Sequence, residues 1–153
     1  MRKQAPKLSA KQAAVGYLSR RDHAEKELRQ KLIMRGYSEP DVSEAIAFCQ
    51  DYNWLDDARY AVMIMKNGIA KGWGWLRIEQ EMHIKGIHHA IVSQTADECE
   101  IDWYELACEV AQRKFGASEM DTPKEKARRF RFMQSRGFDF DQIKSALNIE
   151  DEY

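Results

Sequence analysis

Apolar residues recur every three or four positions along most of the chain, which is the spacing of one face of an α-helix. Leu28 and Leu32 show this spacing, and Ile78 and Met82 repeat it further along the chain. No stretch keeps a strict alternation of apolar and polar residues beyond a few positions, so strand signals are poor. The pattern therefore predicts an all-α protein.

A short motif closes three of the helical runs at a near-constant interval. It joins a cation, a glycine and a large apolar residue, and its glycines are 50 and 51 residues apart (86 − 36 and 137 − 86). This order is typical of a helix C-terminus, where the cation faces the negative end of the macrodipole and the glycine adopts a left-handed conformation. The motif predicts one unit built three times in a helical array. The three copies are Arg35-Gly36-Tyr37, Lys85-Gly86-Ile87 and Arg136-Gly137-Phe138.

Capping signals divide each unit into three helices, which makes three tandem three-helix repeats. The expected domains are residues 1–54 with an N-terminal extension, 55–101, and 102–153 with a short tail whose acidic end, 150–153, is expected to fray. The glycine-rich segment 68–74 is expected to be a flexible connector. Helix starts are predicted near Ala10, Asp22, Ser38, Asp56, Trp75, His88, Asp102, Thr122 and Asp139.

The net charge of −1 hides a strong alternation along the chain. Each block that ends at a glycine cap is basic, and each block that follows is acidic. Basic helices that pack beside acidic ones would neutralise each other and fix the register. Alternatively, the basic blocks face an acidic partner on one side of the array. Basic minus acidic groups give 10 − 3 = +7 for 1–35, 1 − 6 = −5 for 36–60, 4 − 2 = +2 for 61–90, 0 − 6 = −6 for 91–112, 8 − 3 = +5 for 113–136 and 1 − 5 = −4 for 137–153.

The chain carries few candidates for catalysis. It has no Gly-x-x-x-x-Gly-Lys-Ser/Thr phosphate loop and no Gly-x-Ser-x-Gly motif. His83, His88 and His89 cluster before Cys99, but their spacing matches no common zinc pattern, so surface histidines are the simpler interpretation. We expect no enzyme activity, no metal and no cofactor.

Cysteine usage and hydropathy indicate the compartment. Cys49, Cys99 and Cys108 are odd in number and lack Cys-x-x-Cys spacing, which fits free thiols in a reducing cytoplasm. No apolar run approaches ~20 residues, and we expect no secretion signal. We expect a cytoplasmic monomer without a membrane partner.

The aromatic residues leave two interpretations open. The tryptophans 54, 73, 75 and 103 fit core anchors better than platforms for stacking bases. Phe130 and Phe132, interleaved with arginines at 128, 129 and 131, are typical of single-stranded nucleic-acid binding. A helix that packs Phe130 and Met133 inward and its arginines outward would show the same pattern. Direct binding of single-stranded nucleic acid is therefore the alternative function.

Three segments resemble signatures of the RecX family, bacterial regulatory proteins of the RecA recombinase. Residues 21–32 (RDHAEKELRQKL) resemble the first signature, 54–61 (WLDDARYA) the second, and 77–87 (RIEQEMHIKGI) the third. The similarity covers about residues 12–148 in conserved order. Family members often have serine where this chain has Ala24, so the helix cap is expected to depend on Asp22 instead, with Glu25 at capping-box spacing.

The resemblance implies an elongated, curved array of three-helix repeats that binds the RecA filament in its helical groove. It implies suppression of ATP hydrolysis, strand exchange and co-protease activity in recombination, DNA repair and the SOS response, with weak contact to single-stranded DNA. Basic residues near the capped helix ends are the candidate contacts, and solvated helix surface is the alternative for each. They are Arg29, Lys31, Arg35, Arg77, Lys85, Arg128, Arg131 and Arg136.

Overall fold

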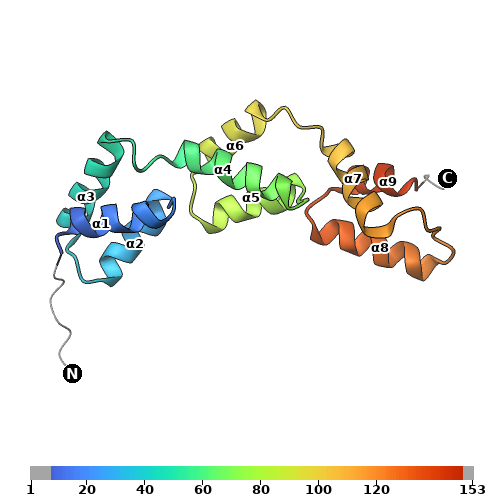
Figure 1. Cartoon of the computed structure of the whole chain (residues 1–153), viewed down its shortest axis with the longest axis horizontal. Helices are drawn as coiled ribbons and strands as arrows, with labels where there is room; N and C mark the ends of the chain where they lie inside the picture. Colours follow the sequence, from blue (N-terminus) through green and yellow to red (C-terminus); the bar gives the residue numbers. More distant parts are fainter. Residues whose placement is uncertain (1–7, 150–153) are drawn as a thin grey trace, which may run out of the picture. The chain divides into compact units, whose positions relative to one another are not determined.

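The computed structural model describes residues 8–149, and within them the chain forms nine helices and no strand (Figure 1). This confirms the all-α prediction. The expected N-terminal extension before residue 8 and the acidic end 150–153 lie outside the described residues. The helices are α1 (Ala10–Arg20), α2 (Glu25–Met34), α3 (Glu39–Asp51), α4 (Asp57–Ala70), α5 (Trp75–Ile84), α6 (His89–Glu98), α7 (Trp103–Phe115), α8 (Pro123–Ser135) and α9 (Phe140–Leu147).

The helices belong to two compact units, and the middle triplet α4–α6 contributes to both. The first unit contains the chain up to Val62 together with Met82–Ala96. The second contains Met63–Glu81 and the chain from Asp97 onward. Because α4 and α5 each begin in one unit and end in the other, neither unit corresponds to a whole number of helix triplets.

The first unit has its core where α1 and α2 pack against α3. Leu28 and Leu32 of α2 are fully buried, four residues apart on one face, as the helical spacing predicts. They meet Val42, Ile46 and Cys49 of α3 in one hydrophobic cluster. Small residues of α1, including the fully buried Ala14, allow that helix to approach closely.

The second unit has its core where α7 and α8 pack against α9. Met133 and Ile143 are fully buried, and Leu106 and Val110 of α7 complete the contact. Phe138 follows the glycine cap of α8 and is only 1% exposed, so this residue of the motif is a core residue.

The three glycine caps form as predicted. Gly36, Gly86 and Gly137 have φ of +96°, +81° and +97°. The amide of the apolar residue after each glycine donates to the carbonyl five residues earlier, at 3.1 to 3.4 Å. This is the Schellman geometry, which satisfies carbonyls that the helix leaves without a partner.

Two boundary predictions are wrong. The helix α2 begins at Glu25 with Ala24 as its N-cap, and the Glu27 carboxylate accepts the Ala24 amide at 3.0 Å. His23 and Ala24 are buried, which holds this segment extended and moves the helix start three residues past Asp22. Gly68 is helical as well, so the connector is shorter than expected; a Cβ at Gly68 would come within 2.5 Å of Ile78 Cγ1.

Candidate partner-binding site

The eight predicted contact residues share one structural position. Every one lies in the second helix of its triplet, or is the residue that follows that helix. Arg29 and Lys31 lie in α2 and Arg35 follows it, Arg77 lies in α5 and Lys85 follows it, and Arg128 and Arg131 lie in α8 and Arg136 follows it. The eight residues differ in the contacts that their side chains already make within the chain.

The two predicted contacts inside α2 are engaged by neighbouring side chains. The Arg29 guanidinium donates to Glu25 at 3.2 Å and to Ser43 at 3.2 Å. The Lys31 ammonium lies 2.8 Å from His23 Nε2 and 5.1 Å from the centroid of the Tyr17 ring. Both side chains therefore help to hold the first unit together.

His23 is the buried centre of this arrangement, only 2% exposed. Its Nδ1 lies 3.0 Å from the Arg21 carbonyl oxygen, so Nδ1 donates and Nε2 is left to accept from Lys31. Burial lowers the pKa of His23, and the charges of Arg21 and Lys31 add to this effect. Burial also lowers the pKa of Lys31. The neutral imidazole is thus the form that the fold requires.

Lys85 connects the end of α5 to the start of α2. Its ammonium lies 3.7 Å from the Glu27 carboxylate, and Gly86 lies directly against the methylene groups of Lys26. Burial alone would raise the pKa of Glu27, but the Ala24 amide, Arg21 and Lys85 outweigh it and lower that pKa. Lys85 is therefore part of an internal contact as well as a surface cation.

Arg77 has the same kind of position where the start of α5 meets the end of α8. The Gly74 amide donates to the Arg136 carbonyl at 2.7 Å, and the Leu76 amide donates to the Gly137 carbonyl at 3.1 Å. Arg77 donates to the Ser135 carbonyl at 3.4 Å and stacks on Trp73, 4.2 Å from its centroid. Amides at the start of α5 thereby satisfy carbonyls at the end of α8.

The arginines of α8 do not all point outward, in contrast to the amphipathic interpretation. Arg129 is buried, donating to Glu125 at 2.9 Å and to the Ser118 carbonyl at 3.0 Å. Arg128 makes two hydrogen bonds to Glu125, which with Arg129 lower the pKa of that carboxyl to about 2. The reason is the loop before α8, whose polar groups face inward and need a charged donor. Arg131 is exposed and has no ion pair within residues 8–149.

The residues after α2 and α8 are cations held over aromatic rings. Arg35 lies 5.5 Å from the centroid of Tyr17, and Arg136 lies 5.0 Å from that of Phe132. Neither forms an ion pair with another described residue. An aromatic face orients a cation without neutralising it, so both charges stay available to a partner.

The structure adds three cations that the sequence analysis missed. Lys71, Arg113 and Lys114 join Arg136 around Phe132, in a cavity of about 240 Å³ that we call the Phe132 cavity. Arg113 and Lys114 lie in the last turn of α7, and Lys71 follows α4. They escaped notice because no repeated motif marks them and the chain does not place them near Arg136 in sequence.

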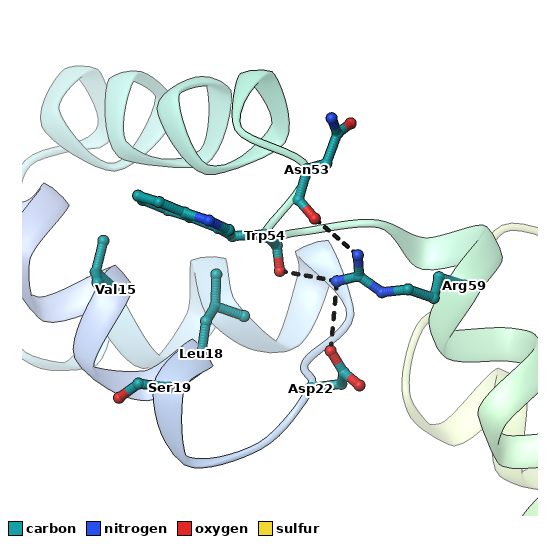
Figure 2. Close-up of a pocket in the computed structure, with 7 residues that line it drawn as sticks. All are labelled: Val15, Leu18, Ser19, Asp22, Asn53, Trp54 and Arg59. Carbon is teal, nitrogen blue, oxygen red and sulfur yellow. Dashed lines mark hydrogen bonds and ion pairs between the residues drawn. The ribbon is translucent and has the colours of Figure 1, made fainter.

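A second cavity, of about 320 Å³, lies in the first unit (Figure 2). Arg59 lines it, donates to the carbonyls of Asn53 and Trp54 at 2.7 and 3.2 Å and forms an ion pair with Asp22 at 3.6 Å. Trp54 is 43% exposed and stacks on Tyr52 at 4.8 Å, so the core-anchor prediction is wrong for this tryptophan. It follows the left-handed Asn53, which turns its side chain out of the core.

The histidine cluster provides no ligand set. His88 and His89 lie ring against ring at 4.2 Å, and the His88 Nδ1 accepts the Ala90 amide. Among residues 8–149, no three His, Cys, Asp or Glu side chains gather as they would around a metal ion. None of the helices in that range is long and apolar enough to span a bilayer.

Comparisons with known proteins match the chain along its length. Models of the first, second and third three-helix domains of RecX match residues 10–49, 56–95 and 100–147. A regulatory protein RecX from Vibrio parahaemolyticus serotype O3:K6 is 46% identical over 99% of this chain and 97% of its own length. A regulatory protein RecX from Haemophilus influenzae (strain PittEE) is 38% identical over 84% of this chain and 86% of its own length. The crystal structure of RecX from Lactobacillus salivarius has the same fold, with a TM-score of 0.76 and 20% sequence identity. The match covers 91% of this chain and 92% of that one.

Proposed function

The chain belongs to the RecX family, and on this premise we propose that it is a non-enzymatic, mainly inhibitory regulator of the RecA recombinase filament. The observation that carries the proposal is the match of three RecX three-helix domains, in order, together with relatives that share nearly the whole length and are named regulatory protein RecX. The protein lies in the helical groove of the filament and suppresses ATP hydrolysis, strand exchange and co-protease activity. We propose that it does so as a cytoplasmic monomer whose repeats comprise residues 1–54, 55–101 and 102–153.

The physical basis of the proposal is repeated weak contact. Several patches on one chain bind a polymer of identical subunits more tightly than any one patch alone, because the second contact forms at a high effective concentration. The equivalent positions of α2, α5 and α8 supply one patch for each triplet. Arg35, Arg131 and Arg136 support this most directly, since no carboxylate of residues 8–149 neutralises them.

The test is an assay of RecA ATP hydrolysis on single-stranded DNA with sub-stoichiometric amounts of this protein. We expect inhibition, and we expect the double variant Arg35→Gln/Arg136→Gln to need about ten times more protein for the same effect, because two surface charge contacts are each worth roughly 0.7 kcal/mol. The variant Lys124→Gln/Lys126→Gln is the matched control, as it removes the same charge from the first turn of α8. Equal inhibition by both variants, with unchanged helicity, would remove Arg35 and Arg136 from the site.

Direct binding of single-stranded nucleic acid is the second candidate. It is favoured by the cations at the end of α8, which stay free of ion pairs with residues 8–149. If nucleic acid is the true target, a free oligonucleotide binds without RecA and its affinity falls steeply as salt is raised. The proposed regulator binds free oligonucleotide only weakly.

A further inference from the structure

The Phe132 cavity collects positive charge from three separate elements. Lys71 follows the end of α4, Arg113 and Lys114 lie in the last turn of α7, and Arg136 follows α8. No carboxylate within residues 8–149 lies in ion-pair distance of any of these four groups. The cluster is therefore a concentration of unneutralised charge from separate helices around one cavity.

Helix macrodipoles explain why cations lie at these helix C-termini. The dipoles are too weak to neutralise the cations. Each helix C-terminus carries roughly half a negative charge, so three ends offset about 1.5 of the four positive charges. More than two positive charges remain around one small cavity. An anion that enters it would relieve the repulsion among them.

Aromatic rings hold three of the four cations, Lys71, Lys114 and Arg136, in place around the cavity. The Lys114 ammonium lies 5.1 Å and the Arg136 guanidinium 5.0 Å from the centroid of Phe132. Lys71 lies 4.9 Å from the centroid of Trp73. Because these contacts fix the cations before a ligand arrives, binding costs less side-chain entropy than it would on a free surface.

The lining of the cavity favours a peptide over nucleic acid. Phe132 has two cations over its ring and Phe115 against it at 5.4 Å, so a base that stacked there would have to displace a cation. The cavity also includes the buried Val110, an apolar surface that a sugar-phosphate chain does not use. A peptide with carboxylates beside one aliphatic side chain matches both the cations and the apolar Val110 of the lining.

We propose that the Phe132 cavity binds an acidic protein segment, with its carboxylates on Arg113, Lys114 and Arg136 and an aliphatic side chain against Val110. The inference deepens the proposed function, because it rests on that function for the partner that carries the segment. The chemistry of the segment is set by the cavity alone. A peptide assay without RecA therefore tests the inference separately from the proposed function.

The probe is the fluorescein-labelled peptide Glu-Glu-Leu-Glu-Glu, added to the full chain and followed by fluorescence anisotropy. We expect binding that the peptide Gln-Gln-Leu-Gln-Gln does not show. Arg113→Gln/Lys114→Gln should weaken it roughly tenfold or more, since each lost charge-assisted hydrogen bond costs several-fold in affinity. The control Lys124→Gln/Lys126→Gln, with the same loss of charge, should bind like the unaltered protein.

Three outcomes would overturn the inference. The acidic peptide fails to bind, or the two double variants bind it equally well, which would mean general charge attraction. Alternatively, a labelled oligothymidylate binds more tightly than the peptide and loses affinity in Arg113→Gln/Lys114→Gln, which would assign the cavity to nucleic acid. Circular dichroism of each variant shows that the fold is intact, because Arg113 and Lys114 are both exposed on α7.

Discussion

Replacement of each cap glycine by alanine separates two roles of the repeated motif. Gly36 and Gly137 have the same backbone conformation, with φ of +96° and +97°. A Cβ at Gly36 would meet nothing within 4 Å. A Cβ at Gly137 would lie 2.5 Å from both the Cβ and the backbone nitrogen of Arg77, and 3.0 Å from the Gly74 oxygen.

The magnitudes follow from these surroundings. Gly36→Ala should cost only the left-handed backbone penalty, roughly 1–2 kcal/mol of the free energy of unfolding. Gly137→Ala should cost the same penalty plus roughly 1–3 kcal/mol for overpacking, because the atoms it meets are backbone atoms and a Cβ attached to the backbone, which cannot swing away. Gly86→Ala should fall between them, since a Cβ there would lie 2.5 Å from the Lys26 Cδ, which can move away, and 2.8 Å from the Lys26 Cβ, which cannot.

Urea unfolding followed by circular dichroism measures the three free energies under one set of conditions. The expected order of destabilisation is Gly137→Ala, then Gly86→Ala, then Gly36→Ala. Equal losses for all three variants would refute the reasoning, because the cap conformation alone would then explain them. A larger loss for Gly36→Ala than for Gly137→Ala would show that the contact between α5 and α8 contributes little to stability.

Two further predictions concern single side chains of the first and second units. The lowered pKa of His23 means that the imidazole of the folded chain resists a proton that the unfolded chain accepts. The free energy of unfolding should therefore fall as the pH drops below about 6.5. His23→Gln should flatten this dependence between about pH 7 and pH 5.5, as measured by urea unfolding. A pH dependence unchanged by the substitution would assign it to other groups. Burial raises the pKa of the Cys49 thiol, whereas Cys108 is exposed, so a maleimide should label Cys108 in the native protein and Cys49 only after unfolding, as located by peptide mass. Rapid native labelling of Cys49 would contradict the packing of α3.

The local parts of this fold were predictable because their signals are local. A glycine between a cation and an apolar residue specifies a helix end by its own backbone preference, and all three caps form. The start of α2 was missed because its cap depends on the burial of His23 and Ala24, which no short motif encodes. Gly68 was taken for a connector because a helical glycine that makes room for Ile78 has the same sequence signal as a loop glycine.

The candidate site was predictable only as a set of positions. The motif indicates where cations occur, and the structure then shows that Arg29, Lys85 and Arg128 already form ion pairs. Lys71 and Lys114 could not be found in this way, because the feature that distinguishes them is the convergence of separate helix ends on one cavity. Arg129, which looks equivalent to its neighbours in sequence, is buried by a loop that precedes its helix.

A cation at a helix C-terminus is weak evidence of function by itself, because the macrodipole favours it there whether or not a partner exists. The evidence becomes stronger where the cation has no carboxylate within the described chain and an aromatic face holds it in place. Arg136 meets both conditions, and it also lines a cavity with cations from two other helix ends. Lys85 meets neither, because Glu27 holds it in the contact between α5 and α2. A loss of the proposed RecA inhibition on replacing Arg136 would therefore report on partner binding, whereas the same loss on replacing Lys85 would first have to be separated from a change in stability.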